Sequence, residues 1–309
     1  LLLTDRIYIH VTENSILLVN QKGSRRKARG CKEHLLLDKA ITEEAKRRKK
    51  NVSMMWVDYK KAYDSIPHSW IRKMLKLYKI DNTTSKVVTE LMPTWCTKTY
   101  LHHSKVTITT DNINYRRGIF QGDTLSPLLF CLCLVPITNI LKREGYGYKI
   151  GNKKISNLMY IDDLKIYARD DIQMERCKAV IQEFSNDITM NFGLEKCAVM
   201  HMKKGKICHS PIIEDIPHMT VEETYKYLGI AQVDEILHKK VKNRAKKEYF
   251  ERVRGILKNK ISAKNTTDSI RTFAMPILRY GCGIVKWTQN EIRRIDCKAR
   301  KILSKNKFH

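Results

Sequence analysis

The chain has 309 residues, 42% of them hydrophobic, which is enough for a sizeable core and excludes wholesale disorder. It carries 59 Lys and Arg against 32 Asp and Glu, a formal net charge of +27. Such an excess of one sign repels itself in the folded state and indicates a polyanionic partner. The partner is either nucleic acid or an anionic membrane surface, and charge alone does not separate the two.

Nine cysteines are scattered along the chain, and none of them forms a CxxC pair. This usage favours free thiols in a reducing, intracellular compartment over a disulfide framework. A loose cluster of Cys197, His201, Cys208 and His209 has no standard zinc spacing, so buried thiols and surface imidazoles are the favoured interpretation. No signal peptide is recognised, and the compartment stays undetermined.

In the first part of the chain, residues 4–18 are predicted to form a short helix and residues 21–30 a basic, glycine-punctuated loop. Apolar spacing predicts a second helix from Leu35 to the basic cluster at 46–50. Residues 52–58 are a continuous apolar run that ends in a carboxylate, which is typical of a buried strand. Pro67 is expected to open the next helix.

Two strands are predicted within residues 97–109, followed by a long helix from near Leu125. Residues 124–141 carry no charge and approach the length of a membrane span. Because this run contains Pro127 and Pro136 and is flanked by charged segments, we expect a buried core helix and no membrane partner.

Residues 158–168 are predicted as two short strands around an Asp-Asp turn, and residues 177–188 as a helix that Gly193 caps. Two further strands are expected at 198–202 and 225–230. After about residue 235 the pattern becomes helical and very basic, so the overall class is α+β.

Three aspartates lie where buried strands meet turns: Asp58, Asp162 and Asp163. An ion pair with Lys or Arg explains any one of them, but adjacent carboxylates repel each other. Divalent metals relieve that repulsion, and two Mg²⁺ ions can act together on a phosphoryl transfer. Asp58 and Asp162 are 104 positions apart, so only the fold can bring them together.

Several segments in order resemble the reverse transcriptases of non-LTR (LINE-type) retrotransposons. The palm motifs are represented by DYKKAYDSIPH (58–68), RGIFQGDTLSPLLF (117–130) and YIDDLKIYA (160–168). Residues 20–41 resemble the fingers, 191–197 and 225–230 the last palm motifs, and 247–258 with 275–296 the helical thumb. Ile161 stands where relatives more often have Ala or Met.

The resemblance implies a right-hand polymerase with incomplete fingers at 1–50, a palm with an antiparallel sheet at 51–232 and a helical thumb at 233–309. It implies truncation at both ends relative to the whole element. The implied reaction is RNA-directed addition of dNTPs to a DNA primer 3′-end with two Mg²⁺ ions, for which Mn²⁺ can substitute. The implied partners are an RNA template, a DNA primer and dNTPs.

The resemblance also assigns roles to individual residues. Asp58, Asp162 and Asp163 would bind the metals, and Lys196 would protonate the leaving pyrophosphate. The remaining assignments place nucleotide or template binding at Arg25, Arg26, Lys27, Arg29, Tyr63, Gln121 and Gly122, and the primer grip at Tyr227, Leu228 and Gly229. The structural alternatives are a core tyrosine for Tyr63 and a solvated surface for the basic residues.

The alternative function is an inactive retrotransposon fragment that only binds nucleic acid. It would show salt-sensitive duplex binding without dNTP incorporation. The sequence leaves open the natural template, the target site, processivity and oligomeric state. Access to the nucleus is expected if the element is active.

Overall fold

The structure is a computed structural model that describes residues 2–103, 106–220, 223–259, 261–306 and 308. Its contacts divide the chain into two compact units, each described by itself. The first unit is Leu1–His34 with Glu44–Thr220, and the second is Leu35–Glu43 with Val221–His309.

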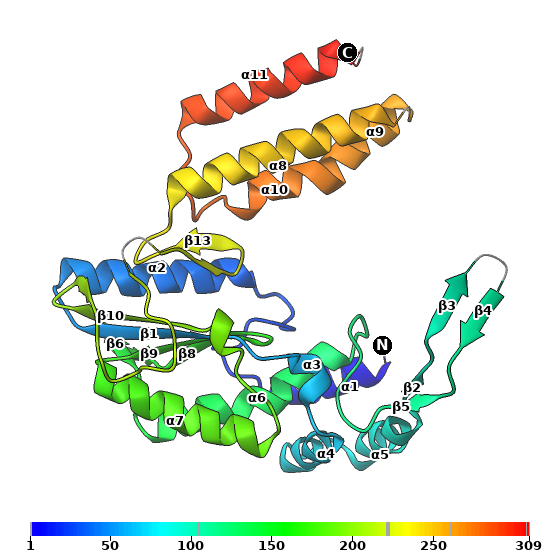
Figure 1. The fold of residues 1–309 in the computed structure, drawn as a ribbon, viewed down its shortest axis with the longest axis vertical. Helices are drawn as coiled ribbons and strands as arrows, with labels where there is room; N and C mark the ends of the chain where they lie inside the picture. Colours follow the sequence, from blue (N-terminus) through cyan, green and yellow to red (C-terminus); the bar gives the residue numbers. More distant parts are fainter. Residues whose placement is uncertain (1, 104–105, 221–222, 260, 307, 309) are drawn as a thin grey trace. The chain divides into compact units, whose positions relative to one another are not determined.

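The first unit combines helices with short strands (Figure 1). Its helices are α1 (Leu2–Glu13), α3 (Ala62–Ser65), α4 (His68–Leu77), α5 (Asn82–Leu91), α6 (Ser126–Arg143) and α7 (Asp171–Asp187), with 3-10 turns at Met92–Thr94 and Leu194–Lys196. Its strands are β1 (Val52–Val57), β2 (Cys96–Thr97), β3 (Tyr100–His103), β4 (Val106–Thr109), β5 (Ile113–Asn114), β6 (Tyr148–Ile150), β7 (Lys153–Ile155), β8 (Asn157–Tyr160), β9 (Asp163–Ala168), β10 (Ala198–Lys203) and β11 (Lys206–Cys208). Helix α2 (Cys31–Arg47) is divided between the two units.

A five-stranded antiparallel sheet in the order β11-β10-β1-β9-β8 forms the centre of this unit. Strand β1 lies in the middle, and all six of its residues are buried. Apart from Ser53, its sequence VSMMWV is therefore apolar rather than alternating, because both of its faces are covered. The register pairs Val57 with Leu164 on β9 and Trp56 with Ala198 on β10.

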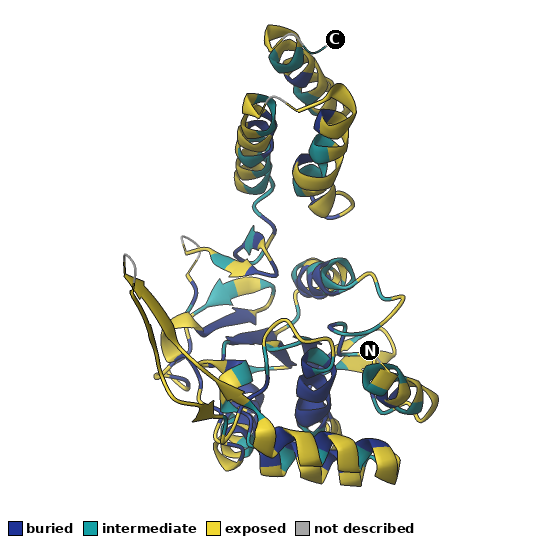
Figure 2. Cartoon of the chain, turned by 90° about the vertical axis from the view of Figure 1, so that its right-hand side faces the viewer, coloured by how far each residue is buried: buried dark blue, intermediate teal, exposed yellow. Residues whose placement is uncertain are grey.

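Helices α6 and α7 lie side by side against one face of this sheet (Figure 1). Their apolar side chains join Met55, Val57, Ile166 and Val199 in one core cluster. Helix α6 is long and apolar enough to cross a membrane by length and composition, but 67% of that stretch is buried inside the protein. Figure 2 shows it as a mostly buried helix, so its apolar composition belongs to the core, as expected.

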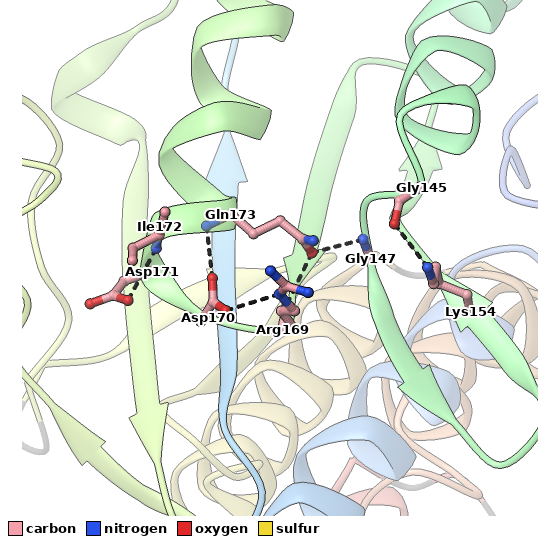
Figure 3. A network of polar contacts seen from close by, with 8 residues as sticks. All are labelled: Gly145, Gly147, Lys154, Arg169, Asp170, Asp171, Ile172 and Gln173. Carbon is pink, nitrogen blue, oxygen red and sulfur yellow. Dashed lines mark hydrogen bonds and ion pairs between the residues drawn. The ribbon is translucent and has the colours of Figure 1, made fainter.

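The first turns of α6 and α7 are fixed by side chains, and Figure 3 shows the contacts at the start of α7. The Asp123 carboxylate accepts hydrogen bonds from the Ser126 amide and hydroxyl, both at 3.1 Å. Asp170 caps α7 by accepting from the Gln173 amide at 2.8 Å. The Gln173 side-chain oxygen accepts from the amides of Gly147 and Arg169, which joins the start of α7 to the β6 segment.

The second unit contains a hairpin of β12 (Tyr225–Tyr227) and β13 (Ile230–Gln232), followed by helices. The helices are α8 (His238–Lys258), α9 (Ala263–Ser269), a π-helical segment (Ile270–Ala274), α10 (Met275–Tyr280) and α11 (Gln289–Lys305). Tyr249, Phe250 and Val253 of α8 pack with Ala274 and Ala299 in its core.

Two of the predictions from periodicity were wrong in detail. Gly193 does not cap α7, which ends at Asp187 with Ile188 as its C-cap. Residues 225–230 are not one strand but a hairpin, in which Leu228 (φ 43°) and Gly229 (φ 77°) form the turn. A two-residue hairpin turn of type I′ requires positive φ at both central residues. Gly229, at the second of these positions, is the sequence signal for such a turn.

Candidate active site

Asp58 follows the last residue of β1, and the segment 191–197 holds it from the side. The Gly193 amide donates to the Asp58 carbonyl at 2.8 Å, and the Asp58 amide donates to the Cys197 thiol sulfur at 3.5 Å. Gly193 also lies beside the Asp58 side chain, since a Cβ on it would be 3.4 Å from Asp58 Oδ1, an ordinary van der Waals contact. The side chain of Asp58 itself is 35% exposed, so the carboxylate stays accessible.

Asp162 lies in the turn between β8 and β9, Asp163 begins β9, and the charges of both interact with that of Asp58. Burial raises the pKa of the Asp162 carboxyl, and the nearby Asp58 charge raises it further. Burial, with Asp162 and then Asp58, raises the pKa of Asp163 to about 6. The fold therefore brings Asp58 together with an acidic pair that begins 104 positions later in the sequence, at a cost in repulsion.

The donor chemistry of this site is that of a hard divalent cation, because carboxylates are the ligands that Mg²⁺ prefers. A cation placed between Asp58, Asp162 and Asp163 would offset both the burial and the mutual repulsion that raise the pKa values of Asp162 and Asp163. Across the described residues, no group of three or more His, Cys, Asp or Glu side chains already has the geometry to hold a metal ion. Rotation of the carboxylates would be needed to bind one.

Lys196 lies at the same edge of the site. Its Nζ is 3.9 Å from Asp58 Oδ1, and the lysine side chain is 66% exposed. An ion pair this long and this exposed contributes little to stability. Lys196 is therefore positioned beside the carboxylates without being immobilised by them.

Gln21 supports the aspartate turn, a role that no pattern in the sequence indicates. Its side-chain oxygen accepts from the Ile161 amide at 3.0 Å, and its side-chain nitrogen donates to the Ile161 carbonyl at 3.3 Å. Ile161 has φ +58°, a strained conformation for a β-branched residue, immediately before Asp162. Gln21 is buried, and its two hydrogen bonds hold the backbone conformation of Ile161, the residue that leads into Asp162 and Asp163.

Gly23 lets the Gln21 segment approach this turn. A Cβ on Gly23 would lie 2.6 Å from the Ile161 nitrogen and 2.5 Å from its Cγ1, which no side chain tolerates. The segment also pairs with β8, since the Lys22 amide donates to the Met159 carbonyl at 3.0 Å. The N-terminal loop thus continues the sheet beside the acidic turn.

Tyr63 lies on the α6 side of the carboxylates. Its ring stacks on Phe130 with centroids 5.0 Å apart and an interplanar angle of 7°. The pKa of the Tyr63 hydroxyl is raised by burial and by the neighbouring charges of Cys131 and Asp162. The ring is half-buried, so it is neither a fully enclosed core tyrosine nor a mobile surface side chain.

The segment 117–122 lies beside residues 63–66, which follow Asp58 in the chain. The Gly118 amide donates to the Ile66 carbonyl at 2.7 Å, and the Ile119 amide donates to the Tyr63 carbonyl at 2.9 Å. Gln121 and Gly122 are exposed beyond this pairing. Gly122 has φ +94° with no protein atom within 4 Å of an added Cβ, so its glycine is explained by backbone conformation rather than by a close protein neighbour.

The four basic residues of the 21–30 loop that were predicted to bind nucleotide or template are in different environments. Arg26 forms an ion pair with Asp5, and its guanidinium lies 4.5 Å from the Tyr8 ring centroid, so it is engaged by α1. Lys27 and Arg29 are exposed. Arg25 Nη1 is buried and has no hydrogen-bond partner, so it is a donor available to an anionic ligand.

Comparison with known proteins decides the family. Residues 3–232 match the family model described as reverse transcriptase (RNA-dependent DNA polymerase). The chain belongs to the reverse transcriptase family. The predicted similarity to non-LTR elements is confirmed by relatives named as Pol polyproteins of the retrotransposable element R2.

The relatives match about two thirds of this reverse transcriptase. A type-1 R2 polyprotein of Popillia japonica is 28% identical over 221 residues, which is 68% of this chain and 30% of that protein. A Nasonia vitripennis R2 polyprotein is 28% identical over 214 residues, 66% of this chain and 20% of the relative. The chain therefore spans less than a third of the length of these relatives.

Solved structures with the same fold are telomerases. Apo telomerase of Candida tropicalis superposes with a TM-score of 0.53 at 11% identity, over 98% of this chain and 55% of that one. The same enzyme in complex with a fragment of telomeric RNA gives 0.54 at 10% identity, over 90% and 46%. At such identities the likeness concerns the fold alone, and it confirms the predicted right-hand polymerase with an antiparallel sheet.

The second unit of the reverse transcriptase contains the residues predicted as the primer grip. Tyr227 ends β12, and Leu228 and Gly229 form the hairpin turn. The Tyr280 hydroxyl donates to the Leu228 carbonyl at 2.5 Å, and its ring lies 3.3 Å from the position of a Cβ on Gly229. The turn is thus fixed by α10.

A basic groove of about 510 Å³ lies between α8 and α11 in this unit. Its floor includes Phe250 and Ile295, and it also contains Glu251 and Glu291. The positively charged lining residues are Lys246, Lys247, Arg254, Arg294 and Lys298. Cationic side chains along an open groove suit a phosphate backbone.

Proposed function

We propose that this chain is an RNA-directed DNA polymerase core, which adds dNTPs to a primer 3′-end at Asp58, Asp162 and Asp163. The observation that carries the proposal is the convergence of these three carboxylates from two separate segments, where burial and then the charges of Asp162 and Asp58 raise the pKa of Asp163 to about 6. A structural ion-pair role would instead place a cation against the pair and lower these pKa values. Membership of the reverse transcriptase family supports the same conclusion.

Asp58, Asp162 and Asp163 would hold two Mg²⁺ ions. When bound, such ions favour the ionised form of the primer hydroxyl and neutralise charge on the triphosphate. The protein's own contribution is positional: Gln21 and Gly23 determine the turn, and Gly193 holds the Asp58 backbone from the other side.

Three further residues have proposed roles in substrate binding. Arg25 Nη1, buried and unpartnered, would donate to triphosphate or template phosphate oxygens. Tyr63, held flat against Phe130, would exclude a 2′-hydroxyl and so select dNTPs. Lys196, 3.9 Å from Asp58, would supply a proton to the leaving pyrophosphate.

The template and primer would be bound largely through charge. The α8–α11 groove would follow the duplex backbone, and the Tyr227–Gly229 hairpin would contact the primer strand. Because phosphate contacts release counterions, duplex affinity should fall steeply as salt rises.

The deciding experiment is primer extension by the purified chain on a poly(rA)/oligo(dT) duplex with Mg²⁺. The test variant is Asp162→Asn with Asp163→Asn, which keeps the shape of both side chains and removes their charge. The matched control is Asp111→Asn, an exposed aspartate outside the site. We expect incorporation by the parent and the control, and a loss of at least about 10³-fold in the double variant.

If folded parent protein binds the duplex but extends no primer, the polymerase proposal is wrong and the binding-only alternative holds. Equal incorporation by the parent and the double variant would also contradict the assignment of the carboxylates. Mn²⁺ in place of Mg²⁺ is expected to support extension.

A further inference from the structure

A second group of potential metal ligands lies at the other end of β10, outside the polymerase site. His201 is on β10, Cys208 ends β11, and His209 and His218 come from the chain that follows. Asp171 begins α7. Cys197, which the sequence grouped with these residues, is not one of them, because its sulfur contacts the Asp58 backbone.

The sheet register places three of these side chains on one face. His201 is directly opposite Cys208 on β11, and His218 forms a parallel bridge with Val199, two residues before His201. Directly paired residues share a face, and so do residues two apart along a strand. His201, Cys208 and His218 therefore project to the same side of the sheet.

The ring of His201 is buried with one nitrogen unsatisfied. Its Nδ1 lies 2.7 Å from the Ser53 hydroxyl, whereas Nε2 is buried and has no hydrogen-bond partner. The residue is only 3% exposed. A buried nitrogen left without a partner loses its hydration without compensation, so it calls for an unseen ligand such as a water or an ion.

His218 has its tautomer determined by its neighbour. Its Nε2 contacts the Ile213 carbonyl, and a carbonyl only accepts, so Nε2 carries the proton. Nδ1 therefore presents a lone pair. A histidine whose other nitrogen donates to a backbone carbonyl is the usual arrangement of a metal-binding imidazole.

The spacing of the two rings suits a shared ion. The centroids of His201 and His218 are 5.5 Å apart. Two imidazoles bound at about 2 Å to one tetrahedral ion have centroids roughly 5 Å apart. His209 stacks on His218 at 4.6 Å with its ring 30° from parallel, so it orients His218 rather than sharing the same ion.

Two further donors are adjacent. Asp171 interacts electrostatically with both His201 and Cys208, and one of its carboxylate oxygens accepts from the Ser210 hydroxyl at 2.7 Å. Figure 3 shows its side chain pointing away from the Arg169–Gln173 contacts that join α7 to β6. Imidazole, thiolate and carboxylate together are ligands typical of zinc.

We propose that His201 Nε2, His218 Nδ1, Cys208 and Asp171 form a structural Zn²⁺ site that joins β10, β11, the 209–218 segment and the start of α7. The described part of the chain has no preformed group of three ligands around one point, so binding requires side-chain rotation. Cys208 and His218 are only partly buried, which leaves them that freedom. The ion would satisfy the buried nitrogen of His201.

The test uses the full chain with Asp162→Asn and Asp163→Asn already introduced, so that the polymerase carboxylates do not contribute. Protein treated with a chelator is titrated with Zn²⁺ by calorimetry and with Co²⁺ by absorption, in which thiolate ligation gives a charge-transfer band. We expect one tight site per chain, a higher Tm with Zn²⁺ and a thiolate band that Cys208→Ser removes.

The ligand variants are His201→Gln and His218→Ala, and the matched control is His102→Ala on the exposed strand β3. Each ligand variant should weaken binding at least about tenfold, with circular dichroism confirming the fold, while the control binds as the parent does. His218 is only partly buried, so His218→Ala tests the site even if the buried His201→Gln variant does not fold. Absence of a tight site in the parent, or unchanged affinity in folded His218→Ala and Cys208→Ser, would overturn the proposal.

Discussion

The side chain of Gln21 bonds to both backbone polar groups of Ile161, 140 positions further along the chain, at 3.0 and 3.3 Å. Ile161 directly precedes Asp162 and has a positive φ. The N-terminal loop therefore determines the geometry of an acidic turn that belongs to a distant hairpin.

Replacing Gln21 with methionine keeps the volume and removes both hydrogen bonds. Because the strained turn then loses its support, we expect dNTP incorporation to fall by about 10- to 100-fold, as small misplacements of catalytic groups do. Steady-state primer extension measures the effect. Gln182→Met on α7 is the matched control, and a Gln21→Met rate equal to that of the control would show that the turn supports itself.

Gly23→Ala should destabilise the first unit. The added Cβ would fall within 2.6 Å of the Ile161 backbone nitrogen, so either the loop or the turn has to move. We expect a loss of about 1–3 kcal/mol in the free energy of unfolding, measured by urea denaturation. Gly122→Ala is the comparison without a steric clash. Its added Cβ would meet no protein atom within 4 Å, so only the positive φ of this position disfavours alanine. A fully stable Gly23→Ala would contradict the close approach.

Tyr63→Ala should relax sugar discrimination. Removing a ring that is held against Phe130 beside Asp162 opens the space where a 2′-hydroxyl would lie. The ratio of rNTP to dNTP incorporation should rise about tenfold or more, measured as kcat/KM for each substrate. Tyr63→Phe keeps the ring and should retain the parent's selectivity. An unchanged ratio in Tyr63→Ala would assign the ring to packing alone.

Glu44 predicts a pH-dependent stability. Burial raises the pKa of this carboxyl, but hydrogen bonds from Lys50 and Tyr148 outweigh it and hold the pKa below its usual value of 4.5. A carboxyl group whose pKa is lower in the folded state than in the unfolded state stabilises the fold at pH values above its unfolded-state pKa. This stabilisation is lost as the pH falls through the folded-state pKa. Its contribution should therefore be complete at pH 7 and decline below about pH 4.5.

The variant Glu44→Gln should lower the free energy of unfolding by about 1–3 kcal/mol at pH 7, an upper range because Lys50 and Arg48 are partly exposed. The difference from the parent should shrink as the pH falls below 4.5. Glu43→Gln, with an exposed side chain, is the control. A difference that stays constant down to pH 3 would rule out the ionised carboxylate as its source.

Most of the elements could be predicted from the sequence because their apolar periodicity is strong and local. The run VSMMWV forms β1, and the segment around Asp162 and Asp163 forms the junction of β8 and β9. The three carboxylates therefore lie at strand ends, as the sequence predicts. The support by Gln21 could not be predicted, since one polar residue in a basic loop gives no sign of a partner 140 positions away. Arg26 was expected at the substrate, but Asp5 and Tyr8 of α1 engage it, and α1 has no signal for that contact.

The position of β1 at the centre of the sheet also affects how this protein is made. Its neighbour β9 begins 106 positions after β1 ends, so β1 has no partner until that stretch has left the ribosome, about 5–20 s at ordinary synthesis rates. During that interval an uncharged six-residue β-forming segment is unpaired, a known aggregation hazard. The strand that precedes Asp58 is thus the part of the nascent chain with the greatest need of a chaperone.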